Sequence, residues 1–274
     1  MPLTSDAAGS RGGSGRLGRA FEAGRPALVA YLMAGYPTRE VSMQALRETV
    51  AAGADLIELG VPYADPMADG PVIRDAAETA RANSGGAFGL TETVQLAAEF
   101  LAEAGDDVPP IAVMTYLNPL MRAGLSKAAD ALTAAGISGV IVPDLPTDMA
   151  GMWLQASPGL DTVFLAAPTS TPDRLAKVGA LSAGFVYCVS TTGVTGERTD
   201  LPPELADLVH RVKAATSLPV AVGFGISTPE QAAAVARVAD GVVVGSALVR
   251  RQDEPSKLGA YCRELVVAVH SARL

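Results

Sequence analysis

The feature that most constrains the fold of this chain is a repeated unit: a short apolar run, a loop rich in Gly, Pro and Asp, then an Ala-rich amphipathic stretch. Nearly every position of each apolar run is apolar, rather than every second one, which is typical of parallel strands covered on both faces. There are eight such runs, at residues 27–35, 55–61, 110–116, 139–144, 162–167, 184–190, 219–225 and 241–247.

Helical patterns lie between the runs, and several of them start with Thr-Pro or with Asp near the first turn, a common helix entry signal. They cover residues 39–52, 72–81, 91–104, 126–135, 148–155, 172–179, 203–216, 229–238 and 255–271. Eight βα units without a linker favour a closed (β/α)8 TIM barrel. A doubly wound sheet also alternates strands and helices, but it usually stops at five or six strands. We therefore predict one catalytic barrel domain over residues 15–274, with a short helix near 17–23, after a flexible arm over 1–14.

Charge and composition exclude several classes of function. A net charge of −8 argues against nucleic acid and against anionic membrane surfaces, because both require a positive patch. The polar N-terminus lacks the apolar segment of a signal peptide, and no apolar run reaches membrane-spanning length. Cys188 and Cys262 are too few for a disulfide framework. We expect a soluble, cytoplasmic protein.

In a barrel the catalytic groups follow the C-terminal ends of the strands, and the absences there are informative. The four lysines and two histidines all fall in predicted helices: Lys127, Lys177, Lys213, Lys257, His210 and His270. We therefore expect neither a Schiff-base lysine, nor a histidine base, nor a histidine-ligated metal. Carboxylates are the acid–base groups that remain at the strand ends.

Two carboxylates stand out near the second strand. Glu58 lies between Ile57 and Leu59, and strand alternation points it away from both, toward the barrel mouth. Burial there raises a carboxyl pKa, which suits a group that donates and accepts protons near neutral pH. Asp69 ends the following loop. Position alone also allows structural roles: a buried acid paired with an Arg or a hydroxyl for Glu58, and a helix cap or an Asp-Gly turn for Asp69.

Glycine-bearing turns follow the last three strands, at residues 192–196, 223–227 and 245–247. Backbone amides in such turns bind phosphate without Lys or Arg, and barrels often place a phosphate site after strands seven and eight. Each turn alone is weak support, but three at adjacent strand ends predict a phosphorylated ligand.

The run LIELGVPYADPMADGP at residues 56–71 closely resembles the signature segment of the tryptophan synthase α-subunit family. Shorter matches follow in family order and extend the resemblance over residues 27–250: YLMAGYP at 31–37, MTYLNP at 114–119, VPDLP at 142–146, Tyr187, GVTG at 193–196, GFGIS at 223–227 and GS at 245–246.

The resemblance implies a role for each matching residue. Glu58 and Asp69 would be catalytic. The substrate-binding residues would be Tyr31, Tyr116 and Tyr187, and the phosphate-binding residues Gly196, Gly225, Gly245 and Ser246. Tyr31, Ile73 and Leu117 are apolar enough to form the wall of an indole pocket. The sequence departs from the family in the loop STTGVTG at 190–196, where many relatives carry Arg in place of Thr191, and in RANSGGAF at 81–88.

The implied reaction is the cleavage of indole-3-glycerol phosphate to indole and glyceraldehyde 3-phosphate, without metal or organic cofactor. It requires a proton at indole C3 and removal of a side-chain hydroxyl proton, which suit Glu58. An ionised Asp69 would stabilise positive charge at the indole nitrogen. The implied partner is a pyridoxal-phosphate β subunit, in a heterotetramer of two α and two β chains. Candidate contacts are Asp65, Pro66, Met67 and residues 118–121.

Three alternatives remain open at this stage. The chain could be a stand-alone indole-releasing lyase with the same site. It could also be a non-catalytic barrel that binds ligand and regulates a β subunit, although the presence of both Glu58 and Asp69 disfavours this. A sugar-phosphate isomerase on the same fold would require the match at residues 56–71 to be coincidence.

Overall fold

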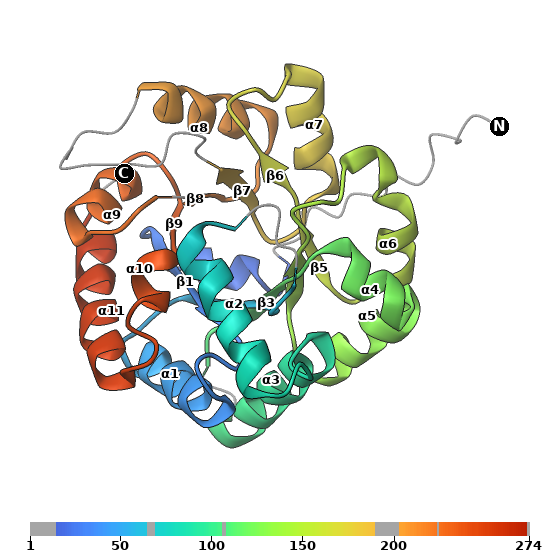
Figure 1. The fold of residues 1–274 in the computed structure, drawn as a ribbon. Coiled ribbons are helices and arrows are strands. Elements are labelled where there is room, and N and C mark those ends of the chain that lie inside the picture. The colour runs from blue at the N-terminus through green and yellow to red at the C-terminus, as the bar shows by residue number, and fades with distance from the viewer. Residues whose placement is uncertain (1–14, 65–68, 106–107, 190–202, 224, 273–274) are drawn as a thin grey trace.

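The computed structural model describes residues 15–64, 69–105, 108–189, 203–223 and 225–272. Its strands form one sheet in the order β5-β4-β3-β2-β1-β9-β8-β7-β6, and every neighbouring pair is parallel. Helices surround the sheet on its outer side (Figure 1). The strands are β1 (Ala27–Met33), β2 (Leu56–Gly60), β3 (Ile111–Met114), β4 (Gly139–Ile141), β5 (Asp161–Val163), β6 (Leu165–Ala166), β7 (Val186–Val189), β8 (Val220–Gly223) and β9 (Gly241–Val244).

The two ends of the sheet are consecutive in sequence, so the sheet closes into a barrel. β5 and β6 are separated only by Phe164, whose carbonyl accepts from the Tyr187 amide at 3.2 Å. The strand predicted over residues 162–167 is therefore split in two, and the described residues form nine strand segments where eight were predicted. At the interruption, the Phe164 amide donates to the Ser182 hydroxyl at 3.2 Å instead of to a strand carbonyl.

The helices confirm the predicted alternation of strands and helices. They are η1 (Gly18–Phe21), α1 (Arg39–Ala51), α2 (Pro71–Asn83), α3 (Leu90–Ala104), α4 (Leu117–Ala123), α5 (Leu125–Ala134), η2 (Thr147–Met149), α6 (Gly151–Ala156), α7 (Pro172–Leu181), α8 (Pro203–Ala215), α9 (Pro229–Ala236), α10 (Ser246–Val249) and α11 (Pro255–His270). None of the helices in the described part is long and apolar enough to cross a membrane.

Local chemistry explains where several helices begin. The Thr38, Thr171 and Thr228 hydroxyls accept from backbone amides in the first turns of α1, α7 and α9, and proline opens α7 and α9. Two predictions were wrong in detail, and one helix was missed. The helix predicted over 148–155 is two pieces, η2 and α6; α4 was not predicted; and the strand predicted over 241–247 ends at Val244, after which α10 begins.

The strands separate two apolar layers, as their continuous apolar patterns require. Residues such as Leu28, Ile57 and Leu59 pack outward against the helices. Alternate residues such as Val29 and Leu56 pack inside the barrel. Glu58 is two residues after Leu56 and therefore points to the same side of the strand, into the barrel. The hydrophobic interior thus surrounds a carboxyl group.

The N-terminal end of the barrel is closed by η1 and the residue before it. Leu17 is fully buried in the interior cluster, and its amide donates to the Asp161 carboxylate at 2.8 Å. The Phe21 ring lies 5.4 Å from that of Phe185. Among the described residues, η1 and Leu17 thus fill this end of the barrel, and the opposite end, where the strands finish, is left for the site. The arm predicted over residues 1–14 lies outside the described residues.

Candidate active site

Glu58 lies in the middle of β2, inside the barrel, between Tyr31 of β1 and Ala112 of β3. Its side chain is fully buried, and neither carboxylate oxygen has a hydrogen-bond partner among the described residues. Burial, followed by the nearby charge of Asp69, raises the pKa of Glu58 from 4.5 to about 8. A buried carboxyl group without a partner is costly to ionise, so Glu58 is mostly protonated at pH 7. The Arg or hydroxyl partner that the sequence left open for Glu58 is absent among the described residues.

Asp69 immediately precedes the N-cap of α2, and its carboxylate accepts a hydrogen bond from the Tyr116 hydroxyl at 3.3 Å. The N-cap itself is Gly70, without a side-chain hydrogen bond. Asp69 is therefore not the helix cap that its position in the sequence allowed. Burial raises the pKa of Asp69, while the Tyr116 hydrogen bond and the charge of Arg74 oppose that increase. These two groups favour the ionised carboxylate.

Tyr31 and Tyr187 place phenol rings beside the two carboxyl groups. Burial, reinforced by Asp69 and Glu58, raises the pKa of Tyr31 well above its ordinary value. Burial, reinforced by Glu58 and Asp69, does the same for Tyr187. Each ring has room only because a glycine lies next to its hydroxyl. A Cβ at Gly60 would overlap the Tyr31 hydroxyl, and a Cβ at Gly223 would overlap the Tyr187 hydroxyl. The structure thus brings Tyr31, Glu58, Asp69, Tyr116 and Tyr187 together.

The predicted phosphate-binding residues follow β8 and β9. Gly225 has a φ of +80°, a conformation that favours glycine. Gly245 is the N-cap of α10 and Ser246 its first residue. A Cβ at Gly245 would lie 3.6 Å from both Ile73 and Tyr31, so this turn borders the tyrosine cluster. Gly196, the remaining predicted phosphate residue, lies outside the described residues.

The helices at the C-terminal end of the barrel complete the surroundings of these residues. α2 and α10 lie side by side and both contact β1 (Figure 1). Ile73 of α2, one of the predicted wall residues, packs with Tyr31. Leu117, the other predicted wall residue, packs against the cluster between the strands and the outer helices.

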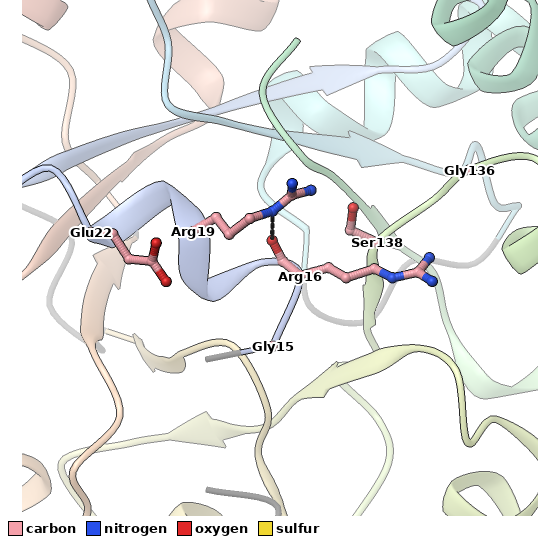
Figure 2. Close-up of a pocket in the computed structure, with 6 residues that line it drawn as sticks. All are labelled: Gly15, Arg16, Arg19, Glu22, Gly136 and Ser138. Carbon is pink, nitrogen blue, oxygen red and sulfur yellow. Dashed lines mark hydrogen bonds between the residues drawn. The ribbon is translucent and has the colours of Figure 1, made fainter. Parts of the chain in front are cut away.

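A pocket at the opposite end of the barrel contains none of the predicted site residues. It is lined by Arg16, Arg19 and Glu22 beside η1, together with Gly15, Gly136 and Ser138 (Figure 2). The Arg19 Nε donates to the Arg16 carbonyl at 3.4 Å. Ser138 precedes β4, which places this pocket at the N-terminal ends of the strands, away from Asp69 and Tyr116.

A chain of polar and aromatic contacts that the sequence did not indicate leads outward from Asp69. Tyr63 stacks on Tyr116 with a centroid distance of 5.3 Å and an interplanar angle of 30°. The Asn118 amide then donates to the Tyr63 hydroxyl at 2.8 Å. One feature of the sequence could have indicated these residues: each follows a strand, β2 for Tyr63 and β3 for Tyr116 and Asn118. Asn118 was assigned only to a contact surface, and Tyr63 to no role.

Comparison with known proteins identifies the family. The family model described as "Tryptophan synthase alpha chain" matches residues 17–270. The tryptophan synthase alpha chain of Mycobacterium marinum is 48% identical over 240 residues, which cover 85% of this chain and 87% of the relative. That of Chloroflexus aurantiacus is 44% identical over 255 residues, which cover 90% and 94%.

Solved structures agree with the sequence comparison. A structure of Mycobacterium tuberculosis tryptophan synthase superimposes with a TM-score of 0.85 at 43% identity, covering 94% of this chain and 99% of that one. Tryptophan synthase subunit alpha from Legionella pneumophila gives a TM-score of 0.83 at 32% identity, covering 94% and 99%. Both agree with the TIM barrel described above. The chain therefore belongs to the tryptophan synthase alpha chain family.

Proposed function

We propose that Glu58 and Asp69 catalyse the α reaction of this family, the retro-aldol cleavage of indole-3-glycerol phosphate to indole and glyceraldehyde 3-phosphate. The chain is accordingly a lyase of tryptophan biosynthesis. One observation carries the residue assignment: a fully buried carboxyl group, with no hydrogen-bond partner among the described residues, lies inside the barrel, close to a second carboxylate and two phenols. An unpartnered buried acid destabilises the fold, which favours a functional role for it.

Glu58 would donate one proton to the substrate and then take one proton from it. With a pKa of about 8 it is mainly protonated at pH 7 and can donate to indole C3. The carboxylate that results takes the proton of the adjacent side-chain hydroxyl. The O–H electrons form the aldehyde C=O bond, and the electrons of the broken C–C bond restore the indole ring. Glu58 ends the cycle protonated, so neither atoms nor protons are left over.

Asp69 would stabilise the intermediate rather than move the proton. Protonation at C3 places positive charge on the indole nitrogen, whose N–H an ionised carboxylate can accept. The Tyr116 hydrogen bond orients the Asp69 carboxylate and favours its ionised form. Tyr31 and Tyr187 would form apolar walls for the ring, and their buried hydroxyls remain protonated because their pKa values are raised.

The phosphate would be bound by backbone amides, since no lysine lies in the described loops that follow β8 and β9. Gly225, Gly245 and Ser246 are the candidates within the described residues, and Gly196 is proposed on the family resemblance alone. Glycine at these turns lets the backbone approach the phosphate oxygens closely.

We further propose a cytoplasmic enzyme that works with a β subunit in a heterotetramer of two α and two β chains. Solved structures of relatives are those of tryptophan synthase, which supports such a partner. The surface at residues 118–121 is a candidate contact: Met121 is 57% exposed, and Asn118 connects through Tyr63 and Tyr116 to Asp69. A partner that moves Asn118 could thereby act on the catalytic carboxylate. The other predicted contacts, Asp65, Pro66 and Met67, lie outside the described residues.

The test is an indole-release assay on indole-3-glycerol phosphate, with and without a β subunit. We expect indole release that increases when the β subunit is added. Equal rates with and without it would favour a stand-alone lyase. Ligand binding without turnover under both conditions would refute the catalytic assignment and favour a regulatory barrel.

A further inference from the structure

The turns after β8 and β9 are connected through two residues that the sequence analysis did not assign. Tyr261 lies in α11, and its hydroxyl donates to the Ser227 carbonyl in the turn after β8. The guanidinium carbon of Arg251 lies 3.8 Å from the centroid of the Tyr261 ring. Arg251 also donates to the Ala247 carbonyl in α10 at 2.7 Å. A continuous chain of contacts therefore joins the two turns.

Each end of this chain lies within two residues of a proposed phosphate-binding residue. Ser227 follows Gly225 by two positions and is also bound by Gln231, whose side-chain oxygen accepts from the Ser227 amide at 2.9 Å. Ala247 follows Ser246 directly, within the four-residue helix α10. The Gln231 bond is local to α9, whereas Tyr261 ties the same turn to a different helix, α11.

We propose that Arg251 and Tyr261 are positioning residues that hold the Gly225 turn and the Gly245–Ser246 turn at the separation required by one phosphate group. This inference rests on the proposed function, because it assumes that both turns bind the substrate phosphate. Amides on two separate turns can bind one phosphate together only if their spacing is held, and errors of about 1 Å already weaken such sites. The stacked guanidinium and the phenol fix that spacing without touching the ligand.

The first test is Tyr261→Phe, which keeps the ring under Arg251 and removes the hydrogen bond to Ser227. We expect KM for indole-3-glycerol phosphate to increase by about threefold to tenfold, the range for loss of one neutral hydrogen bond, with kcat within about twofold. The inhibition constant of inorganic phosphate should increase by the same factor, because the defect concerns the phosphate turns.

The second test removes the other half of the contact. Arg251→Met should raise KM by a similar factor. Arg251→Lys should give an intermediate value, since it keeps the charge but not the planar stacking group. The Arg251→Met, Tyr261→Phe double variant should have a KM no higher than the worse single variant, because both substitutions break one chain of contacts.

Thr49→Val is the matched control. Thr49 is buried in α1, which packs on α11, and its hydroxyl also donates to a backbone carbonyl, that of Ala45, at 2.8 Å. We expect a small loss of stability with unchanged KM and unchanged inhibition by phosphate.

The possible failures are distinguishable. If Tyr261→Phe and Arg251→Met lower the melting temperature but leave KM and phosphate inhibition within about twofold of wild type, the two residues only stabilise the fold and the inference is wrong. If Arg251→Met does not fold, Arg251→Lys and Tyr261→Phe still decide the matter. If the wild-type protein neither releases indole nor is inhibited by phosphate, the proposed function itself fails.

Discussion

Replacing Glu58 with glutamine keeps the shape of the side chain and removes its ability to ionise, so it separates the catalytic role of Glu58 from its effect on stability. In the folded protein the pKa of Glu58 is raised from 4.5 to about 8, first by burial and then by Asp69. At 1.36 kcal/mol per pKa unit, this shift corresponds to a loss of folding stability with an upper limit on the order of 5 kcal/mol when Glu58 ionises in the unfolded chain. Local relaxation reduces such penalties, and we expect the unfolding free energies of Glu58→Gln and wild type to differ by about 2 kcal/mol.

The sign of the effect depends on pH. Below about pH 4.5 the Glu58 carboxyl is protonated in both the folded and the unfolded chain, and its ionisation affects neither. Between about pH 4.5 and 8 the unfolded chain ionises while the folded protein retains the proton, so the free energy of unfolding decreases as pH rises. Above pH 8 the whole penalty is present. Glu58→Gln removes this penalty and should therefore be more stable than wild type at pH 8, but similar to it near pH 4.5.

The measurement is urea unfolding of wild type and Glu58→Gln at pH 5 and pH 8. The quantity of interest is how much the difference in unfolding free energy between the two proteins changes from pH 5 to pH 8, because contributions from other carboxylates cancel. Glu78→Gln is the control, since it makes the same substitution on an exposed residue of α2. Indole release should fall by about 10²–10⁴-fold in Glu58→Gln, the usual cost of losing a general acid–base. In wild type, kcat/KM should fall as pH rises through about 8, as the acid form is lost.

Two results would contradict this reasoning. A stability difference that is the same at pH 5 and pH 8 would show that Glu58 does not hold its proton in the folded state. Robust indole release by Glu58→Gln would remove Glu58 from the mechanism whatever its pKa.

Three further substitutions test the rest of the site. Asp69→Asn should lower kcat by about 10²–10³-fold while inorganic phosphate still inhibits and the circular dichroism is unchanged, because Gly70 rather than Asp69 caps α2; an unfolded variant would restore the capping explanation. Gly60→Ala should force Tyr31 aside, cost about 1–3 kcal/mol in urea unfolding and raise KM; wild-type stability and KM would show that the ring has room to move. Gly225→Asp should raise KM at least about tenfold, because it adds strain at a φ of +80° and a charge near the phosphate. The uncharged Gly225→Asn variant should tolerate that backbone better. Equal KM values for Gly225→Asp and wild type would remove Gly225 from the phosphate site.

The sequence was sufficient to predict the order of the elements and the side of the strand on which Glu58 lies. Continuous apolar runs and amphipathic stretches are local patterns, and eight units that alternate the two favoured a closed barrel. Strand alternation placed Glu58 opposite Ile57 and Leu59, and the structure confirms that these two residues pack outward. The family resemblance was confirmed by the match over residues 17–270.

The distribution of polar contacts could not be predicted in the same way. At the interruption of the fifth strand, the Phe164 amide donates to a hydroxyl 18 residues away. Asp69 is bonded to Tyr116, which is 47 residues distant in sequence. Tyr261 reaches Ser227 across 34 residues. No local pattern encodes any of these pairs.

Local sequence therefore specifies which elements form and which of their faces are apolar, because strand and helix periodicities depend only on neighbouring residues. Tertiary structure decided what surrounds each polar group. Pairing of β1, β2 and β3 places Glu58 inside the closed barrel, where it is buried with no hydrogen-bond partner in the described part of the chain. Its pKa of about 8 depends on that burial and on the nearby charge of Asp69, two quantities that exist only once the strands have closed.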